Sequence, residues 1–127
     1  LLPLICYEVI FPNLVEKNKK YDFIVNITND GWYGYSFGPF QHLALARIRA
    51  VEEGKTLLRV ANTGISAVIN YNGNIIASLD LNKKGIIDKR VKLVEKQTLY
   101  KKYGDSLFYG LIGVLCLYLL IFYSIPR

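Results

Sequence analysis

A cysteine that could act as a nucleophile stands at position 6, directly after the apolar run at residues 3–5. The run predicts a short strand, and the segment Phe11 to Lys20 predicts a short helix after a sharp turn. A thiol at such a junction lies near unpaired backbone N–H groups and the positive end of a helix dipole, which favour the thiolate. The position therefore allows covalent catalysis, although on position alone a buried structural cysteine is the commoner explanation.

The elements that follow Cys6 begin with a strand predicted over Tyr21 to Thr28, which runs into a glycine-rich loop from Asp30 to Pro39. Pro39 opens a helix that extends to Glu53, and Gly54 ends it as a C-cap. Apolar residues at helical spacing predict the buried stripe of this helix. The stripe consists of Phe40, Leu43, Ala44, Ile48 and Val51.

Four further strands are predicted after the helix, and Asn72-Gly73 is a two-residue hairpin signal between the second and the third of them. They cover Thr56 to Ala61, Ile65 to Tyr71, Asn74 to Leu79 and Gly85 to Val94. Strands that alternate with helices and end in an antiparallel hairpin indicate an α/β fold built on a layered sheet. The sheet starts in the middle of its pattern, and the chain starts with Leu1 rather than Met, so we expect further strands upstream.

The C-terminal segment from Ser106 to Pro126 contains no charged residue and is long enough to cross a bilayer as a helix. We predict a folded domain at residues 1–104 and a transmembrane helix with the C-terminus at residues 105–127. A buried core helix is the alternative, but soluble core helices seldom run so far without a charge.

Composition and charge narrow the classes of function. Hydrophobic residues make up 52% of the chain, which excludes a disordered segment, and the net charge is +6. Much of that charge lies between Lys83 and Lys102, where it fits anionic headgroups beside a membrane helix better than a nucleic acid. Cys6, Cys116 and the single His42 cannot supply a structural metal site, and a disulfide to the apolar tail is not expected.

Several short motifs occur in an order and spacing that resemble the nitrilase, or carbon-nitrogen hydrolase, superfamily over residues 2 to 80. They are Ile5-Cys6-Tyr7-Glu8 followed by Phe11-Pro12, Asn29-Asp30-Gly31-Trp32-Tyr33-Gly34, Gln41-His42-Leu43 with Ala46-Arg47, and Arg59 with Asn62-Thr63-Gly64-Ile65-Ser66. The Cys-Tyr-Glu run, the Trp-containing loop and the apolar tail together resemble the membrane branch of that superfamily, the apolipoprotein N-acyltransferases.

The resemblance implies a four-layer α-β-β-α sandwich and a Glu-Lys-Cys triad in which Cys6 is the cysteine. The glutamate and lysine are expected upstream, outside this chain, so the chain alone should be inactive. The family assigns the positions of Tyr7 and Glu8 importance for acyl transfer, and the Tyr7 N–H is a natural donor to the oxyanion. Turn packing and a helix-start carboxylate are the alternative roles of these two residues.

The same resemblance implies that the loop contributes substrate-binding residues, namely Asn29, Trp32 and Tyr33. Trp32 is expected to contact an acyl chain or gate the site, and a core tryptophan is the alternative. His42 is expected to be a satisfied polar residue at a helix start rather than a general base.

The implied reaction transfers an acyl chain from a phospholipid to the S-diacylglyceryl cysteine of an apolipoprotein, without a cofactor or a metal. The implied location is the bacterial inner membrane, with the catalytic domain on the outer face. The charges beside the tail favour the opposite orientation, but that rule is weak for long translocated segments. An amidase and an inactive membrane-tethered interaction module are the alternative functions.

Overall fold

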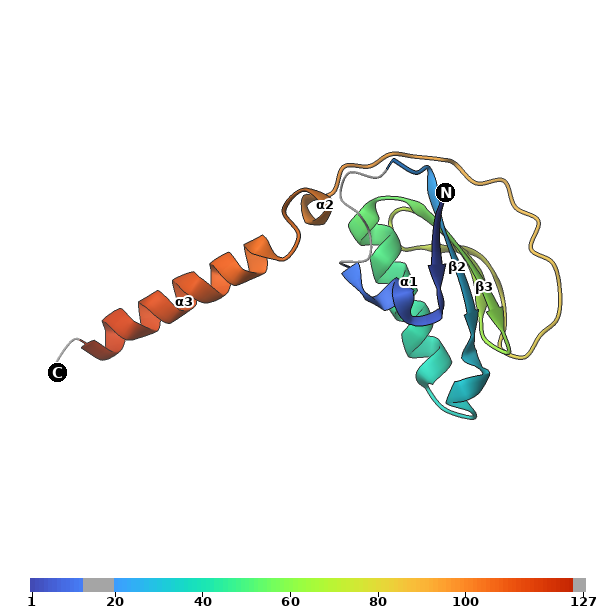
Figure 1. The fold of residues 1–127 in the computed structure, drawn as a ribbon, viewed down its shortest axis with the longest axis horizontal. Coiled ribbons are helices and arrows are strands. Elements are labelled where there is room, and N and C mark those ends of the chain that lie inside the picture. The colour runs from blue at the N-terminus through green and yellow to red at the C-terminus, as the bar shows by residue number, and fades with distance from the viewer. Residues whose placement is uncertain (13–19, 125–127) are drawn as a thin grey trace.

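A computed structural model describes residues 1–12 and 20–124, and its centre is one five-stranded sheet covered on one face by a helix (Figure 1). The strands are β1 (Leu2–Ile5), β2 (Phe23–Asn29), β3 (Thr56–Asn62), β4 (Ser66–Ile69) and β5 (Ile75–Leu79). The helical elements are η1 (Cys6–Ile10), η3 (Asp30–Tyr33), α1 (Gly38–Glu53), α2 (Leu99–Tyr103) and α3 (Ser106–Ser124). The helix predicted over 11–20 falls largely outside the described residues.

The sheet has the order β1-β2-β3-β4-β5, with β1, β2 and β3 parallel and the last two pairs antiparallel. The β4–β5 hairpin turns where the sequence predicts it, at Gly73, whose φ of 80° suits a residue without a Cβ. The side chain of Asn70 stabilises this turn by accepting hydrogen bonds from the N–H groups of Asn72 and Asn74, at 3.0 and 2.9 Å. The predicted α/β sheet with a terminal hairpin is confirmed.

Helix α1 packs on one face of the sheet and ends at Gly54, which has the left-handed φ of 62° expected of a C-cap. The apolar stripe predicted for this helix is confirmed at Leu43 only: Phe40 and Ile48 are each 52% exposed, and Ala46 and Ala50 are buried instead. The buried face of α1 also carries three polar side chains, His42, Arg49 and Glu53, which the apolar pattern could not place there.

Among residues 1–12 and 20–124, no helix covers the other face of the sheet. Residues on β1, β2 and β3 alternate between the two faces, so Leu4 is buried under α1 while its neighbour Ile5 is 51% exposed. Ile27 and Val60 are exposed on the same outer face, at 51% and 58%. The described residues therefore form one helix layer and one sheet layer, which is half of a four-layer sandwich.

The strand predicted over 85–94 is wrong: residues 83–98 form no regular secondary structure. This segment does not pair with β5, because a turn at Asp80–Lys83 and the left-handed Asn82 (φ 61°) lead the chain away. It returns to the sheet through the Lys92 carbonyl, which accepts a hydrogen bond from Thr56 at 3.1 Å.

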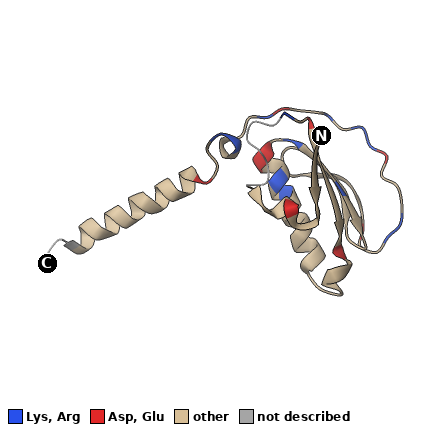
Figure 2. Ribbon diagram, in the orientation of Figure 1, with Lys and Arg blue, Asp and Glu red and all other residues tan. Residues whose placement is uncertain are grey.

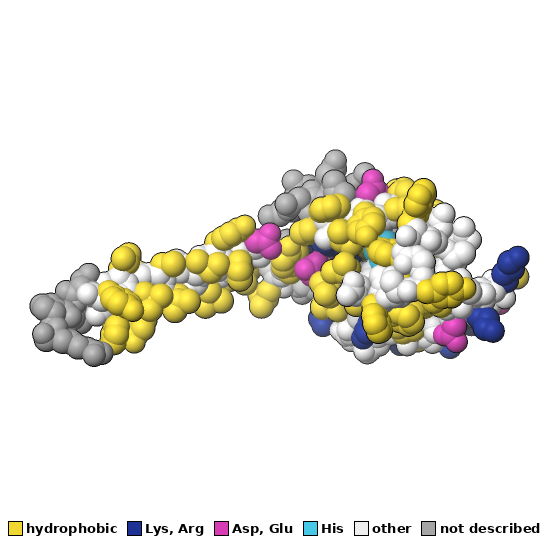
Figure 3. Space-filling model, turned by 90° about the horizontal axis from the view of Figure 1, so that it is seen from below, with side chains coloured by type: hydrophobic (Ala, Val, Ile, Leu, Met, Phe, Trp, Pro, Cys, Tyr) yellow, Lys and Arg dark blue, Asp and Glu magenta, His cyan; other side chains and the backbone are white. Residues whose placement is uncertain are grey.

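An 18-residue window of helix α3, Ser106–Tyr123, has a mean hydropathy of 2.1. None of this window is buried by the described residues. By length and composition it is apolar enough to cross a membrane, and the described residues do not bury it; its transmembrane placement stays a prediction. Figure 2 shows no charged residue along α3, and Figure 3 shows hydrophobic side chains over its length. The domain division at residue 104 stays a prediction.

Candidate active site

Cys6 lies at the turn between β1 and η1 and has a φ of 49°. A residue other than glycine in this left-handed region costs about 1–3 kcal/mol, and such residues cluster at functional sites. The turn is closed by Glu8, whose carboxylate accepts a hydrogen bond from the Ile5 N–H at 2.6 Å. Cys6 is half-buried as a residue and forms no disulfide.

The backbone of this turn is hydrogen-bonded on its buried side to Asn26, a fully buried residue of β2. Its Nδ2 group donates to the carbonyl oxygens of Leu4 and Cys6, at 3.0 and 3.3 Å. Its Oδ1 atom accepts a hydrogen bond from the Nη1 group of Arg59, on β3. Leu4 of β1 and the nucleophile are therefore connected to β2 and β3 through one amide.

Arg59 also forms a buried ion pair with Asp30, in which Nη2 lies 2.7 Å from Oδ2. The other carboxylate oxygen of Asp30 lies 2.9 Å from His42 Nδ1 and accepts from Thr28 at 3.1 Å. Because the carboxylate only accepts, His42 carries its proton on Nδ1, and the 3.1 Å contact of that atom with Arg59 is not a hydrogen bond. Three donors thus surround one carboxylate.

The pKa of Asp30 reflects these neighbours. Burial alone would raise the pKa of this carboxyl, but hydrogen bonds from His42 and Arg59 and the Arg59 charge outweigh it and lower the pKa below its usual value. Burial lowers the pKa of Arg59, and the Asp30 charge offsets part of this. The Asp30 carboxylate is therefore ionised at neutral pH and pairs with the Arg59 guanidinium.

Two tyrosines cover this cluster on the side of Cys6. The ring of Tyr7 stacks on His42, and the hydroxyl of Tyr33 donates to that of Tyr7 at 2.7 Å. Burial and this hydrogen bond raise the pKa of the Tyr33 phenol above its usual value, so the phenol stays protonated. The structure thereby brings Tyr33 from the loop to the residue that follows the nucleophile.

The other predicted residues are placed differently. Asn29 accepts a hydrogen bond from the Gly31 N–H at 3.1 Å and so caps η3. Trp32 is 90% exposed, so it does not belong to the core that the described residues form, and its contact with lipid stays a prediction. His42 is buried with Nδ1 satisfied, but its Nε2 atom has no hydrogen-bond partner among the described residues, so the prediction of a satisfied histidine holds for one nitrogen.

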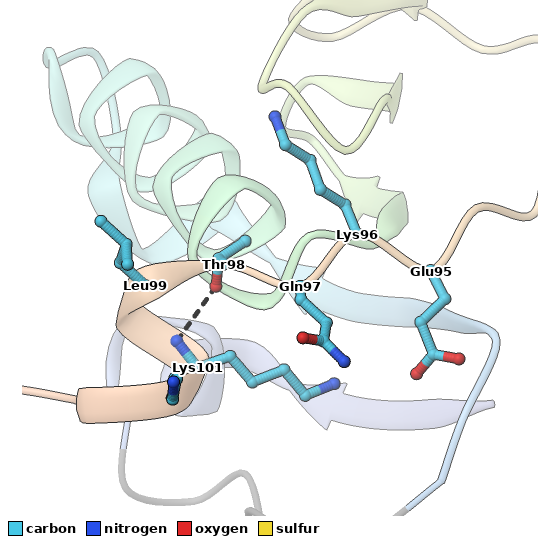
Figure 4. Close-up of a pocket in the computed structure, with 7 residues that line it drawn as sticks. Glu95, Lys96, Gln97, Thr98, Leu99 and Lys101 are labelled. Atoms are coloured by element: carbon cyan, nitrogen blue, oxygen red, sulfur yellow. Dashed lines mark hydrogen bonds between the residues drawn. The ribbon is translucent and has the colours of Figure 1, made fainter.

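A pocket of about 470 Å³ lies elsewhere, between the segment before α2 and α2 itself (Figure 4). Lys96, Thr98 and Lys101 line it, and the Thr98 hydroxyl caps α2 by accepting from the Lys101 N–H at 3.0 Å. No cysteine is among its described lining residues. Within residues 1–12 and 20–124, no cluster of three metal-binding side chains is found.

Sequence reasoning missed Asn26, Thr28 and Arg59 as parts of the site. A signal was present, because the period of two along β2 puts Asn26 and Thr28 on the same face as the core residue Ile24. Two polar side chains on a buried face need partners there. The long-range partner Arg59 could be identified only once β3 was paired with β2.

These features agree with the families that the chain matches. The carbon-nitrogen hydrolase family profile matches residues 2–101, and the chain belongs to that family. A carbon-nitrogen hydrolase superfamily protein from Xanthomonas campestris, solved with an arsenic adduct in its active site, is similar in fold at a TM-score of 0.50. The identity is 16%, and the match covers 87% of this chain and 45% of that one.

The similar curated relatives are apolipoprotein N-acyltransferases. The protein from Bradyrhizobium diazoefficiens is 53% identical over 82% of this chain, and the one from Rhizobium rhizogenes is 41% identical over 90%. The Rickettsia bellii protein is 50% identical over 81%. The chain spans only 20%, 22% and 21%, respectively, of the length of these relatives.

Proposed function

We propose that this chain carries the nucleophile of an apolipoprotein N-acyltransferase. The acyl donor is a phospholipid, and the acceptor is the free α-amino group of an S-diacylglyceryl cysteine at the start of an apolipoprotein. The observation that carries the proposal is Cys6 in a left-handed turn, partly exposed, in a chain 53% identical to a relative of that name. No cofactor or metal enters the proposed reaction.

The chemistry proceeds in two transfers at one sulfur. The Cys6 thiolate attacks the ester carbonyl of the phospholipid, and collapse of the tetrahedral intermediate breaks the C–O bond and releases the lysophospholipid alcohol, which takes up a proton. The acceptor amine then attacks the thioester. Collapse breaks the C–S bond, the amine loses a proton, and the amide product leaves Cys6 free.

Residues near Cys6 support these steps in different ways. Each tetrahedral intermediate carries an oxyanion, for which the Tyr7 N–H is the proposed donor. Glu8 shapes the turn through its bond to Ile5 and is the second proposed contributor from the Cys-Tyr-Glu run. Asn29, Trp32 and Tyr33 are proposed to form the substrate side, with the exposed Trp32 meeting the acyl chain.

The general base and the second oxyanion donor are proposed to be a glutamate and a lysine in other parts of a longer protein. Support comes from the small share of the relatives that this chain spans. On this proposal the chain alone is inactive. Its α3 lies in the bacterial inner membrane, and the catalytic domain lies on the outer face.

The test uses the full-length protein in detergent, with phospholipid and a synthetic diacylated lipopeptide. Cys6→Ala should abolish both the acyl-enzyme, seen by intact mass spectrometry, and the N-acylated product. Cys116→Ala, in α3, is the matched control and should retain both. An acyl adduct on Cys116, or turnover by the Cys6→Ala variant, would refute the proposal. Release of free fatty acid without lipopeptide product would instead identify a hydrolase.

A further inference from the structure

The buried amide of Asn26 contacts both the nucleophile turn and Arg59 of the Arg59–Asp30 ion pair. Arg59 has only donors, so the amide atom that faces it is Oδ1. The NH₂ group of Asn26 must then face the carbonyl oxygens of Leu4 and Cys6, as observed. The guanidinium and the two carbonyl groups therefore require the same orientation of this amide.

This orientation determines how the peptide group between Cys6 and Tyr7 lies. In a planar trans peptide the C=O and N–H bonds point in opposite directions. The Cys6 carbonyl points down to the buried Asn26, so the Tyr7 N–H points away from the buried cluster, toward the open side of the turn. Tyr7 is in the first turn of η1, where an N–H has no acceptor within the helix.

We infer that Asn26 is a positioning residue that keeps the Tyr7 N–H aimed at the reacting carbonyl, and that Arg59 keeps Asn26 in the required orientation. The left-handed φ of Cys6 makes such a support necessary, since a strained turn persists only when its surroundings over-determine it. Neither side chain touches the substrate. This inference rests on the proposed acyl transfer and adds the residues that would set its oxyanion donor.

Asn26→Asp is the sharpest test because it keeps the shape of the side chain and the bond to Arg59. It removes only the NH₂ group and places a carboxylate oxygen opposite the Leu4 and Cys6 carbonyls, which repels them and turns the Cys6–Tyr7 peptide over. Asn70→Asp is the matched control, because Asn70 acts only as an acceptor in its turn and aspartate accepts equally well.

In the full-length protein, Asn26→Asp should lower kcat by about a hundred- to a thousandfold, the usual effect of losing one oxyanion donor. KM should stay unchanged, and iodoacetamide should still alkylate Cys6, because neither the substrate contacts nor the thiol is altered. A crystal structure of the variant should show the Cys6 carbonyl turned outward. Asn70→Asp should match the wild type in all three measurements.

An unchanged kcat, or an unturned peptide in the Asn26→Asp structure, would overturn the inference. If the aspartate variant does not fold, Asn26→Leu removes the same donors without a charge and should show the same loss of kcat at constant KM. A rise in KM with constant kcat in that variant would also refute it. If the wild type forms no acyl-enzyme, the proposed function fails, and the peptide orientation in the variant still decides this inference.

Discussion

The ring of Tyr7 lies nearly parallel to the imidazole of His42, with the centroids 5.1 Å apart and the planes inclined by 19°. Tyr7 is itself 51% exposed, so it covers the buried histidine from the solvent side. The residue that follows the nucleophile is thus in direct contact with the cluster around Asp30. A change in that cluster can reach the turn through this stacked pair as well as through Asn26.

Replacing the stacked ring should cost stability. Tyr7→Ala should lower the free energy of unfolding by about 1 kcal/mol, as expected for loss of an aromatic pair. Tyr7→Phe keeps the ring and loses only the hydrogen bond with Tyr33, so it should lie close to the wild type. Urea titration followed by circular dichroism measures both. Tyr35→Ala, at a fully exposed site, is the control, and an equal effect at both positions would contradict the proposed role of the stack.

Removing Arg59 should be the most damaging of these substitutions, because it leaves the buried Asp30 carboxylate without its counter-ion. Arg59→Met should lower the free energy of unfolding by about 3–5 kcal/mol, the usual cost of breaking a buried ion pair from one side. Adding Asp30→Asn should recover part of the loss. Arg47→Met is the control, since the Arg47 guanidinium donates to the Gly73 carbonyl at 2.8 Å and its loss should cost about 1 kcal/mol. Purely additive effects in the double variant would argue against the pairing.

The stability contributed by Asp30 should depend on pH in the acid range. Its pKa is lower in the folded chain than in the unfolded one, so the contribution is complete above the unfolded value of about 3.9 and is lost as the pH falls below it. The difference in unfolding free energy between wild type and Asp30→Asn should therefore be constant from pH 7 to about pH 5 and shrink toward pH 3. A constant difference for Asp30→Asn down to pH 3 would disprove the shift.

Trp32 should affect turnover rather than folding. Its side chain is 90% exposed, so Trp32→Ala should change the free energy of unfolding by no more than about 0.5 kcal/mol. In the full-length protein the same variant should turn over long-chain phospholipid more slowly while iodoacetamide still labels Cys6 at the normal rate. Turnover of short-chain and long-chain donors should be compared. Equal rates for both donors in the wild type and the variant would exclude an acyl-chain contact.

The sequence predicted the parts of the fold that depend on local pattern. The end of α1 at Gly54 and the hairpin turn at Gly73 follow from the conformational freedom of glycine, and the structure confirms both. The strand predicted over 85–94 failed because a β-rich composition does not register the turn at Asp80–Lys83, which leads the chain away from the edge of β5. The face of α1 was wrong because residues 42, 49 and 53 are buried through polar contacts that an apolar pattern does not register.

The candidate site likewise has one part that the sequence predicts and one part that it does not. Cys6, Tyr7 and Glu8 are consecutive, so their proximity required no knowledge of the fold. Asn26 and Arg59 are 33 residues apart, and they meet only because β2 and β3 are parallel neighbours in the register that pairs them directly. Long-range register of this kind depends on the whole sheet and is not readable from either segment alone.

Helix α3 does not pack on the sheet domain: none of its apolar window is buried by the rest of the described chain. Such a helix, once in a bilayer, would add nothing to the folding free energy of the sheet and would act through geometry. It would confine the thiol to a thin layer at the membrane surface, which raises the effective concentration of lipid that the thiol meets. The thiol would then meet its lipid substrate by diffusion within the plane of the membrane rather than through solution. A weak affinity of the site for each phospholipid would therefore suffice for turnover.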